Sequence, residues 1–243
     1  MVTKLIRKLA AIAFVLGLAQ APVQGAVTYF TGVNTNQIPA LTGFATTGAL
    51  MSGLAVTADF SFAGSETLIW ATTGVDSGGV SSASGWGLSL TGDTFSDPWN
   101  FTIAAGVNLG QLNRLTLDGL SAFTVFDRTI PSFGTDGSAQ GNDFECTAAS
   151  AAVCSDHDVL VTYDFQVNLA GDPAVGDLWQ TVVIEFRDPV TEALSGPRVD
   201  WSFLQDTDND ARRFQVPEPG SLLLLGLAFG AAGLISRRRK ITH

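Results

Sequence analysis

The sequence predicts an all-β protein, an antiparallel β-sandwich or jelly roll. Three observations lead to this prediction. Apolar residues recur with a period of two in several segments, and each segment is bounded by Gly, Pro, Asp or Asn. The segments together carry more large apolar side chains, five tryptophans among them, than a single sheet can cover. Because no amphipathic helical pattern occurs in the body of the chain, we expect helices only near the two ends.

Residues 1–25 are typical of a secretory signal peptide. Three basic residues come first, and the ten-residue apolar stretch 9–18 follows. Ten apolar residues are too few to cross roughly 30 Å of bilayer hydrocarbon, so this signal helix is not a membrane span. Small residues precede Ala26, and we expect cleavage between Gly25 and Ala26. The sequence therefore predicts an exported protein.

Residues 26–204 are predicted to form the sandwich as one domain. The clearest strands are 159–169, where Val, Tyr, Phe and Leu alternate with polar residues, and 178–187. Other segments with a period of two are 54–62, 86–91 and 99–103, with weaker ones at 27–31, 67–71, 114–118, 122–127 and 199–204. Trp86, Trp99 and Trp201 are in phase with apolar neighbours and are expected in the core. Residues 205–215 are polar and acidic, and we expect a linker there.

The charge of the chain is divided unevenly. The net charge is −10, but seven of the 13 basic residues lie in the two terminal segments. Residues 26–215 keep six arginines and no lysine against 22 acidic residues, a net charge of −16. This charge excludes nucleic-acid binding, because a protein that binds nucleic acid needs a basic face to neutralise the phosphates. The body repels anionic polymers, stays soluble and attracts divalent cations.

Cys146 and Cys154 are the two cysteines of the chain. In an oxidising compartment an isolated pair is expected to form a disulfide. The spacing is not that of a redox-active Cys-x-x-Cys motif, and two cysteines are too few for a four-cysteine zinc site. We expect the disulfide to hold the segment before the strand 159–169.

Asp206, Asp208 and Asp210 alternate along the predicted linker, a pattern in which carboxylates can converge on Ca²⁺. Neither the glycine nor the bidentate glutamate of an EF-hand loop is in place, and two arginines follow directly. The preferred interpretation is an acidic linker, with a calcium site as the alternative. No other cofactor is expected.

The residues indicate a protein that is not an enzyme. The one histidine of the body, His157, lies between two aspartates, but no nucleophile elbow and no zinc-binding helix motif accompanies it. A carbohydrate-binding module, or a glycoside hydrolase that uses two of the many carboxylates, is the alternative. Trp179 is the candidate sugar platform. It shares a strand face with Glu185, which leaves open whether that face is covered or exposed.

Residues 216–243 form a tail of three parts. The motif Val216, Pro217, Glu218 and Pro219 comes first, the apolar run 222–235 follows, and Arg237, Arg238, Arg239 and Lys240 form a basic cluster. The prolines keep the motif extended and accessible to a protease or transpeptidase. The apolar run is short for a membrane helix but sufficient if the basic side chains reach the interface, and they keep the C-terminus cytoplasmic.

This tail closely resembles the PEP-CTERM protein-sorting tail of Gram-negative bacteria. The resemblance implies that an exosortase, a membrane-embedded transpeptidase-like enzyme, recognises and processes the tail. It covers about 25 of 243 residues and implies little about the body. We therefore expect a non-enzymatic protein that is exported by the secretion machinery. Its tail is expected to anchor it transiently in the inner membrane, until exosortase releases it to the cell surface or the biofilm matrix. Extracellular polysaccharide is the expected further partner.

Overall fold

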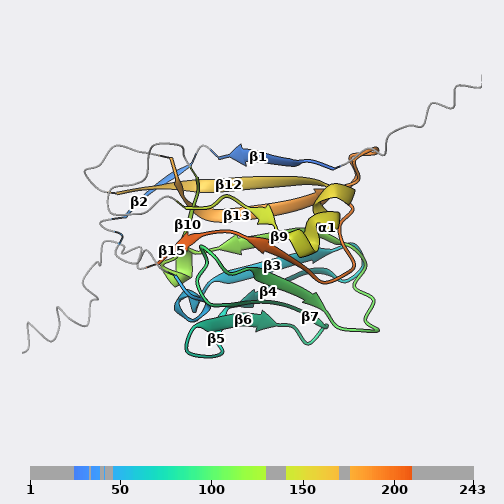
Figure 1. Ribbon diagram of the computed structural model, residues 1–243, viewed down its shortest axis with the longest axis horizontal. Helices are drawn as coiled ribbons and strands as arrows, with labels where there is room; N and C mark the ends of the chain where they lie inside the picture. Colours follow the sequence, from blue (N-terminus) through green and yellow to red (C-terminus); the bar gives the residue numbers. More distant parts are fainter. Residues whose placement is uncertain are drawn as a thin grey trace, which may run out of the picture.

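The computed structural model describes residues 25–32, 34–38, 41, 46–129, 141–169 and 176–209, and it confirms the all-β fold (Figure 1). Two sheets contain nearly all of the regular structure. The helical segments are short: α1 (Ala151–Asp156) and the 3₁₀ turns η1 (Gly48–Met51), η2 (Leu120–Ala122) and η3 (Ala148–Ser150). The predicted signal helix, the tail and residues 210–215 lie outside the described residues.

The larger sheet is mixed. Its strands in spatial order are β1 (Val27–Thr31), β12 (Asp158–Leu169), β13 (Leu178–Arg187), β9 (Leu112–Asp118), β3 (Ala55–Phe60) and β4 (Gly64–Ile69). β2 (Thr35–Ile38) also pairs with β12, while β10 (Val125–Asp127) pairs with both β13 and β15 (Thr207–Asp208). β1 and β2 run parallel to β12, which differs from the expected antiparallel pairing. Parallel pairing is possible because a long crossover, not a hairpin, connects them to β12.

The smaller sheet is antiparallel throughout. Its order is β11 (Glu145–Cys146), β14 (Trp201–Leu204), β8 (Trp99–Ile103), β7 (Trp86–Thr91), β6 (Ser77–Ser81) and β5 (Ala71–Thr72). β5 to β8 follow one another in the chain as a meander, while β14 comes from the C-terminal part and lies between β8 and the edge strand β11.

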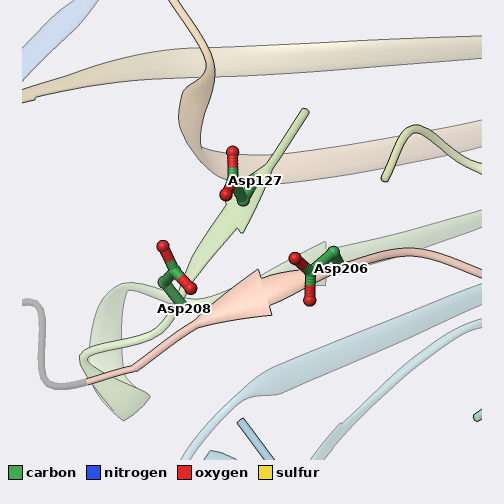
Figure 2. Close-up of side chains that lie close together, drawn as sticks. All are labelled: Asp127, Asp206 and Asp208. Carbon is green, nitrogen blue, oxygen red and sulfur yellow. The ribbon is translucent and has the colours of Figure 1, made fainter. Parts of the chain in front are cut away.

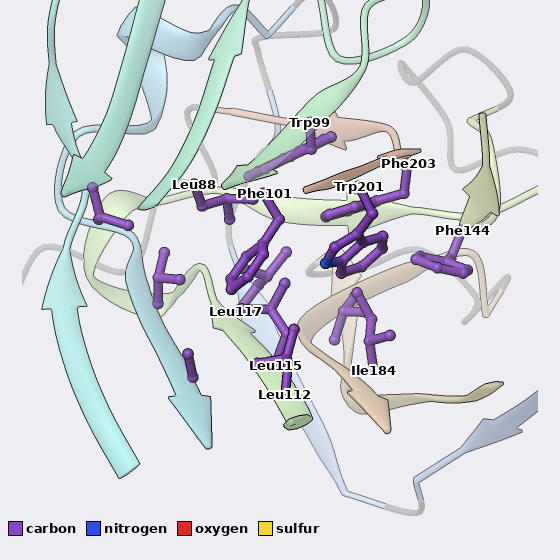
Figure 3. Close-up of a cluster of buried hydrophobic side chains, with 14 of the residues drawn as sticks. Leu88, Trp99, Phe101, Leu112, Leu115, Leu117, Phe144, Ile184, Trp201 and Phe203 are labelled. Carbon is purple, nitrogen blue, oxygen red and sulfur yellow. The ribbon is translucent and has the colours of Figure 1, made fainter. Parts of the chain in front are cut away.

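The two sheets pack face to face through large apolar side chains (Figure 3). Phe60 of β3 has its ring centroid 6.1 Å from that of Trp86 on β7, and Phe186 of β13 meets Trp201 of β14 edge-on at 5.1 Å. Trp86, Trp99 and Trp201 are all buried, which confirms their predicted place in the core. Full burial of a large apolar side chain contributes about 1.5–3 kcal/mol, so these contacts stabilise the sandwich strongly.

β12 has different neighbours before and after Phe165. Alternation along this strand predicts that Phe165 points inward with Tyr163, but Phe165 is 36% exposed and has a φ of 56°. The left-handed backbone turns its side chain outward. Before Phe165, β12 pairs with β1 and packs in the main core. After it, β12 pairs with β2, and Val167 and Leu169 join a second, smaller apolar cluster.

Residues 205–208 belong to the fold, so the predicted start of the linker at residue 205 is wrong. Thr207 and Asp208 form β15, and Gln205 is buried. The side chain of Gln205 accepts a hydrogen bond from the Tyr163 hydroxyl at 2.6 Å and donates to backbone carbonyls, including that of Asn142 at 3.1 Å. These polar residues are satisfied within the protein, whereas composition alone suggested that they face water.

Candidate functional site

Three aspartates meet where β10 pairs with β15 (Figure 2). Asp127 ends β10, Asp206 directly precedes β15 and Asp208 ends it. Each offers a carboxylate oxygen, and these three oxygens lie within 4.8 Å of one another. The side chains are nearly inaccessible, with residue exposures of 1%, 5% and 1%. Strand pairing thus buries carboxylates from two distant parts of the chain in one place.

The carboxylate of Asp206 is held by two hydrogen bonds. Its Oδ1 accepts hydrogen bonds from the Thr94 hydroxyl at 2.9 Å and from the Thr207 backbone N–H at 2.8 Å. The pKa of Asp206 is raised to about 7: burial is the largest cause and the nearby charges of Asp208 and Asp93 add to it, while the two hydrogen bonds oppose the rise. The arrangement suits either a shared proton or a hard divalent cation, since carboxylate oxygens are ligands that Ca²⁺ and Mg²⁺ prefer.

The structure brings together only part of the predicted calcium ligands. Asp206 and Asp208 lie side by side in the cluster, and Asp210 lies outside the described residues. Asp127 was missed, because only the pairing of β10 with β15 places it there. Calcium binding at Asp206, Asp208 and Asp210 therefore stays a prediction.

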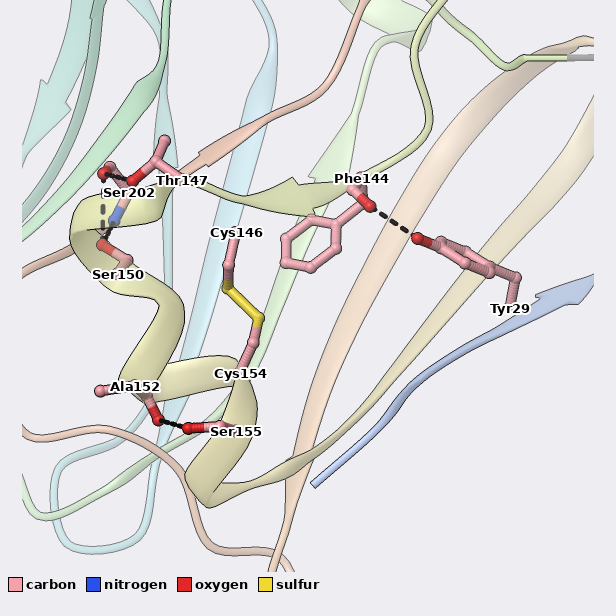
Figure 4. Close-up of a disulfide and its surroundings, with 9 residues drawn as sticks. All are labelled: Tyr29, Phe144, Cys146, Thr147, Ser150, Ala152, Cys154, Ser155 and Ser202. Atoms are coloured by element: carbon pink, nitrogen blue, oxygen red, sulfur yellow. Dashed lines mark hydrogen bonds between the residues drawn. A yellow bond between two sulfur atoms is a disulfide. The ribbon is translucent and has the colours of Figure 1, made fainter. Parts of the chain in front are cut away.

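Cys146 and Cys154 form the predicted disulfide (Figure 4). It connects β11 to α1 across a Cα–Cα distance of 6.3 Å. The enclosed residues fold into η3 and α1, not an irregular loop. Ser202 of β14 fixes them by donating its N–H to the Ser150 hydroxyl at 2.7 Å. The disulfide thus holds a helical turn against the edge of the smaller sheet, immediately before β12.

Trp179 does not form a sugar platform. It is 3% exposed, its indole N–H donates to the Gly176 carbonyl at 3.0 Å, and its ring lies near that of Tyr163. β10 pairs with β13 opposite Trp179 and extends the sheet around it. The prediction of Trp179 as a sugar platform is wrong, because Trp179 belongs to the main apolar core, and the local pattern could not show this burial.

His157 and its neighbouring aspartates have structural contacts. The imidazole meets the ring of Phe186 edge-on, and burial lowers its pKa despite the nearby charges of Asp156 and Asp188. Asp158 accepts the backbone N–H of Ala26 at 3.0 Å and so helps to fix the beginning of β1. His157 and Asp158 thus have structural contacts at the beginning of β12.

Residues 215–240 match the family model of the PEP-CTERM protein-sorting motif. This match coincides with the predicted tail and does not include the sandwich. The protein is therefore an exported β-sandwich protein. More particularly, it carries a PEP-CTERM tail and is sorted by an exosortase.

No curated protein and no solved structure significantly matches the chain. None of the helices within the described residues has the length and apolar character needed to cross a membrane. The apolar run 222–235, predicted to anchor the tail, lies outside that part of the chain.

Proposed function

We propose that this is a non-enzymatic protein of the cell surface or extracellular matrix, released there after an exosortase at the inner membrane has processed its tail. The match of residues 215–240 to the sorting motif carries this proposal. Removal of the apolar run leaves a mature protein without a predicted membrane anchor, as cleavage of a GPI signal does.

The body supports an extracellular role. Its net charge of −16 favours solubility and disfavours adsorption to anionic polymers. The Cys146–Cys154 disulfide is of a kind that persists in oxidising compartments. Arg128, one of few cations of the body, is held in a bidentate ion pair with Asp143 and lies over the ring of Tyr163, so it too has a structural place.

The mature C-terminus tests the sorting proposal. The full chain is produced in a Gram-negative host that contains an exosortase and in an otherwise identical host without it, and surface and membrane fractions are analysed by mass spectrometry. We expect the surface protein to lack the basic cluster only where exosortase is present. A variant with Pro217→Ala and Pro219→Ala should remain unprocessed in the membrane fraction. Surface protein that retains an intact Arg237–His243 end would contradict the proposal.

The proposal that the protein is not an enzyme is tested separately. Purified full chain is incubated with a panel of extracellular polysaccharides, and the release of reducing ends is measured. We expect no release above that of a heat-denatured sample. Turnover that disappears on substitution of a carboxylate would show a glycoside hydrolase instead.

A further inference from the structure

A groove of ≈ 670 Å³ lies beside the point where β12 exchanges β1 for β2. Residues of β2, β12 and β13 line it together with the turn between β9 and β10. Its volume lies within the range of about 300–1,000 Å³ found for small-molecule sites. None of the three clustered aspartates, Asp127, Asp206 and Asp208, lines this groove.

Two phenylalanines in the groove have unusual backbone conformations. Phe123 has a φ of 54° and Phe165 a φ of 56°. In the described part of the chain only three non-glycine residues have a positive φ, and two of them line this groove. A bulky residue in the left-handed region is strained, whereas glycine adopts that conformation readily.

Burial does not account for the choice of phenylalanine at these positions. Phe123 is 49% exposed and Phe165 is 36% exposed, so much of each ring faces solvent. An exposed aromatic ring at a strained position gains little from the core that would offset its cost. Backbone strain of this kind clusters at functional sites, and a ring that faces solvent in a groove is available for contact with a ligand.

Polar side chains form a connected row in the same groove. The Asn36 amide donates to Gln180 Oε1 at 2.5 Å, and the Gln180 amide donates to Asp118 Oδ1 at 3.1 Å. The backbone N–H of Leu120 also donates to Asp118 Oδ1, at 2.9 Å. The row fixes the orientation of two amides and a carboxylate, and each of these groups has further donor or acceptor positions.

We propose that this groove binds a neutral saccharide. A pyranose has an apolar C–H face that packs on an aromatic ring and hydroxyl groups that pair with carboxylate and amide oxygens and with amide N–H groups. Phe123 and Phe165 supply the first kind of contact, and Asn36, Asp118 and Gln180 supply the second. The negative charge of the body, with Asp118 in the groove, disfavours an anionic sugar. This binding goes beyond the proposed sorting function and does not require tail processing.

Glycine substitutions separate a binding role from a structural one. Phe123→Gly and Phe165→Gly remove the rings and relieve the left-handed strain, so neither should lower the melting temperature if the rings serve a ligand. Phe95→Ala is the matched control, because Phe95 is an exposed phenylalanine outside the groove. Asp118→Asn is a second, shape-conserving variant that weakens pairing with sugar hydroxyls.

The full chain, purified in a detergent without a sugar headgroup, is screened on an array of neutral and anionic oligosaccharides, and hits are measured by titration calorimetry. We expect a neutral oligosaccharide to bind, with Kd raised at least tenfold in both glycine variants and unchanged in Phe95→Ala. Binding only of anionic sugars, no binding at all, or equal binding by the glycine variants would overturn the proposal. A lower melting temperature in both glycine variants with unchanged Kd would show that the rings are structural.

Discussion

The Glu66 carboxylate of β4 accepts a hydrogen bond from the indole N–H of Trp86 on β7, at 2.8 Å, and so connects the two sheets. The hydroxyls of Ser82 and Ser84 donate to the same carboxylate at 2.6–2.9 Å. One charged acceptor thus serves three donors at the margin of the sandwich. Hydrogen bonds to a charged group are stronger than neutral ones, so this contact stabilises the position of the smaller sheet.

We expect Glu66→Ala to lower the free energy of unfolding by about 1–3 kcal/mol, because it leaves the Trp86 N–H without its acceptor. Glu66→Gln keeps an acceptor oxygen and should cost less. Urea denaturation at neutral pH measures both variants. Equal stability of Glu66→Ala and the unaltered protein would show that the contact contributes nothing.

The Glu66 carboxylate should also make the stability of the protein sensitive to acid. Hydrogen bonds from Ser84, Ser82 and Trp86 lower the pKa of Glu66 below the ordinary value of a glutamate side chain, 4.5. The folded state therefore holds a proton less tightly than the unfolded state, so this stabilisation is complete above the unfolded pKa and is lost as the pH falls through the folded one. Unfolding of the unaltered protein and of Glu66→Gln between pH 3 and pH 7 should converge at the acid end. Parallel curves would contradict this.

Asp206 predicts the opposite dependence. Its pKa is raised to about 7 from 3.8, so the folded state holds the proton more tightly than the unfolded state. The associated stability is present below about pH 4 and is lost as the pH rises to about 7. We expect the unaltered protein, in the presence of a chelator, to lose stability over this interval relative to Asp206→Asn. A difference between the two proteins that does not vary with pH would refute the raised pKa.

Calcium binding at the acidic cluster is tested by the melting temperature in millimolar Ca²⁺ and in chelator. If the predicted site exists, Ca²⁺ raises the melting temperature, since a ligand that binds only the folded state stabilises it. Asp127→Asn should abolish this increase. Glu192→Gln, which changes an exposed carboxylate, serves as the control for general charge screening. An unchanged melting temperature would leave the acidic cluster with a purely structural role.

The disulfide should stabilise the sandwich by about 2.5 kcal/mol according to the loop-entropy model. Cys146→Ser combined with Cys154→Ser is expected to lower the free energy of unfolding by that amount, and urea denaturation of the double variant measures it. Mass spectrometry of the non-reduced, exported protein should find no alkylated cysteine. Alkylation of both thiols without reductant would show that the disulfide does not form.

The period of two in the sequence predicted the main strands correctly, but it did not predict which parts of the fold surround each strand. The alternation in 159–169 and 178–187 identified β12 and β13, because half-buried strands impose a period of two on the sequence. The same alternation could not reveal that Phe165 is turned outward, since a single left-handed residue leaves the apolar pattern unchanged.

Errors about the candidate sites have a common physical origin. The sequence predicts neither the burial of Trp179, nor the position of Asp127 beside Asp206, nor the place of residues 205–208 in the fold. In each case the deciding partner is a strand far away in the sequence, β10 or β15. Burial of polar residues depends on such pairings, which composition and spacing do not contain. The tail was identified correctly because its three parts are contiguous.

The pairing of β1 with β12 has a consequence for the order in which the exported chain can fold. β1 lies at the beginning of the described chain, and its partner lies in the C-terminal half. β15, which pairs with β10 in the larger sheet, ends at Asp208, shortly before the tail begins at residue 216. A chain that crosses the membrane from its N-terminus cannot finish the sandwich until the segment next to the sorting motif has emerged. Folding so dominated by remote contacts is slow. The sandwich is therefore still incomplete when the tail approaches the membrane.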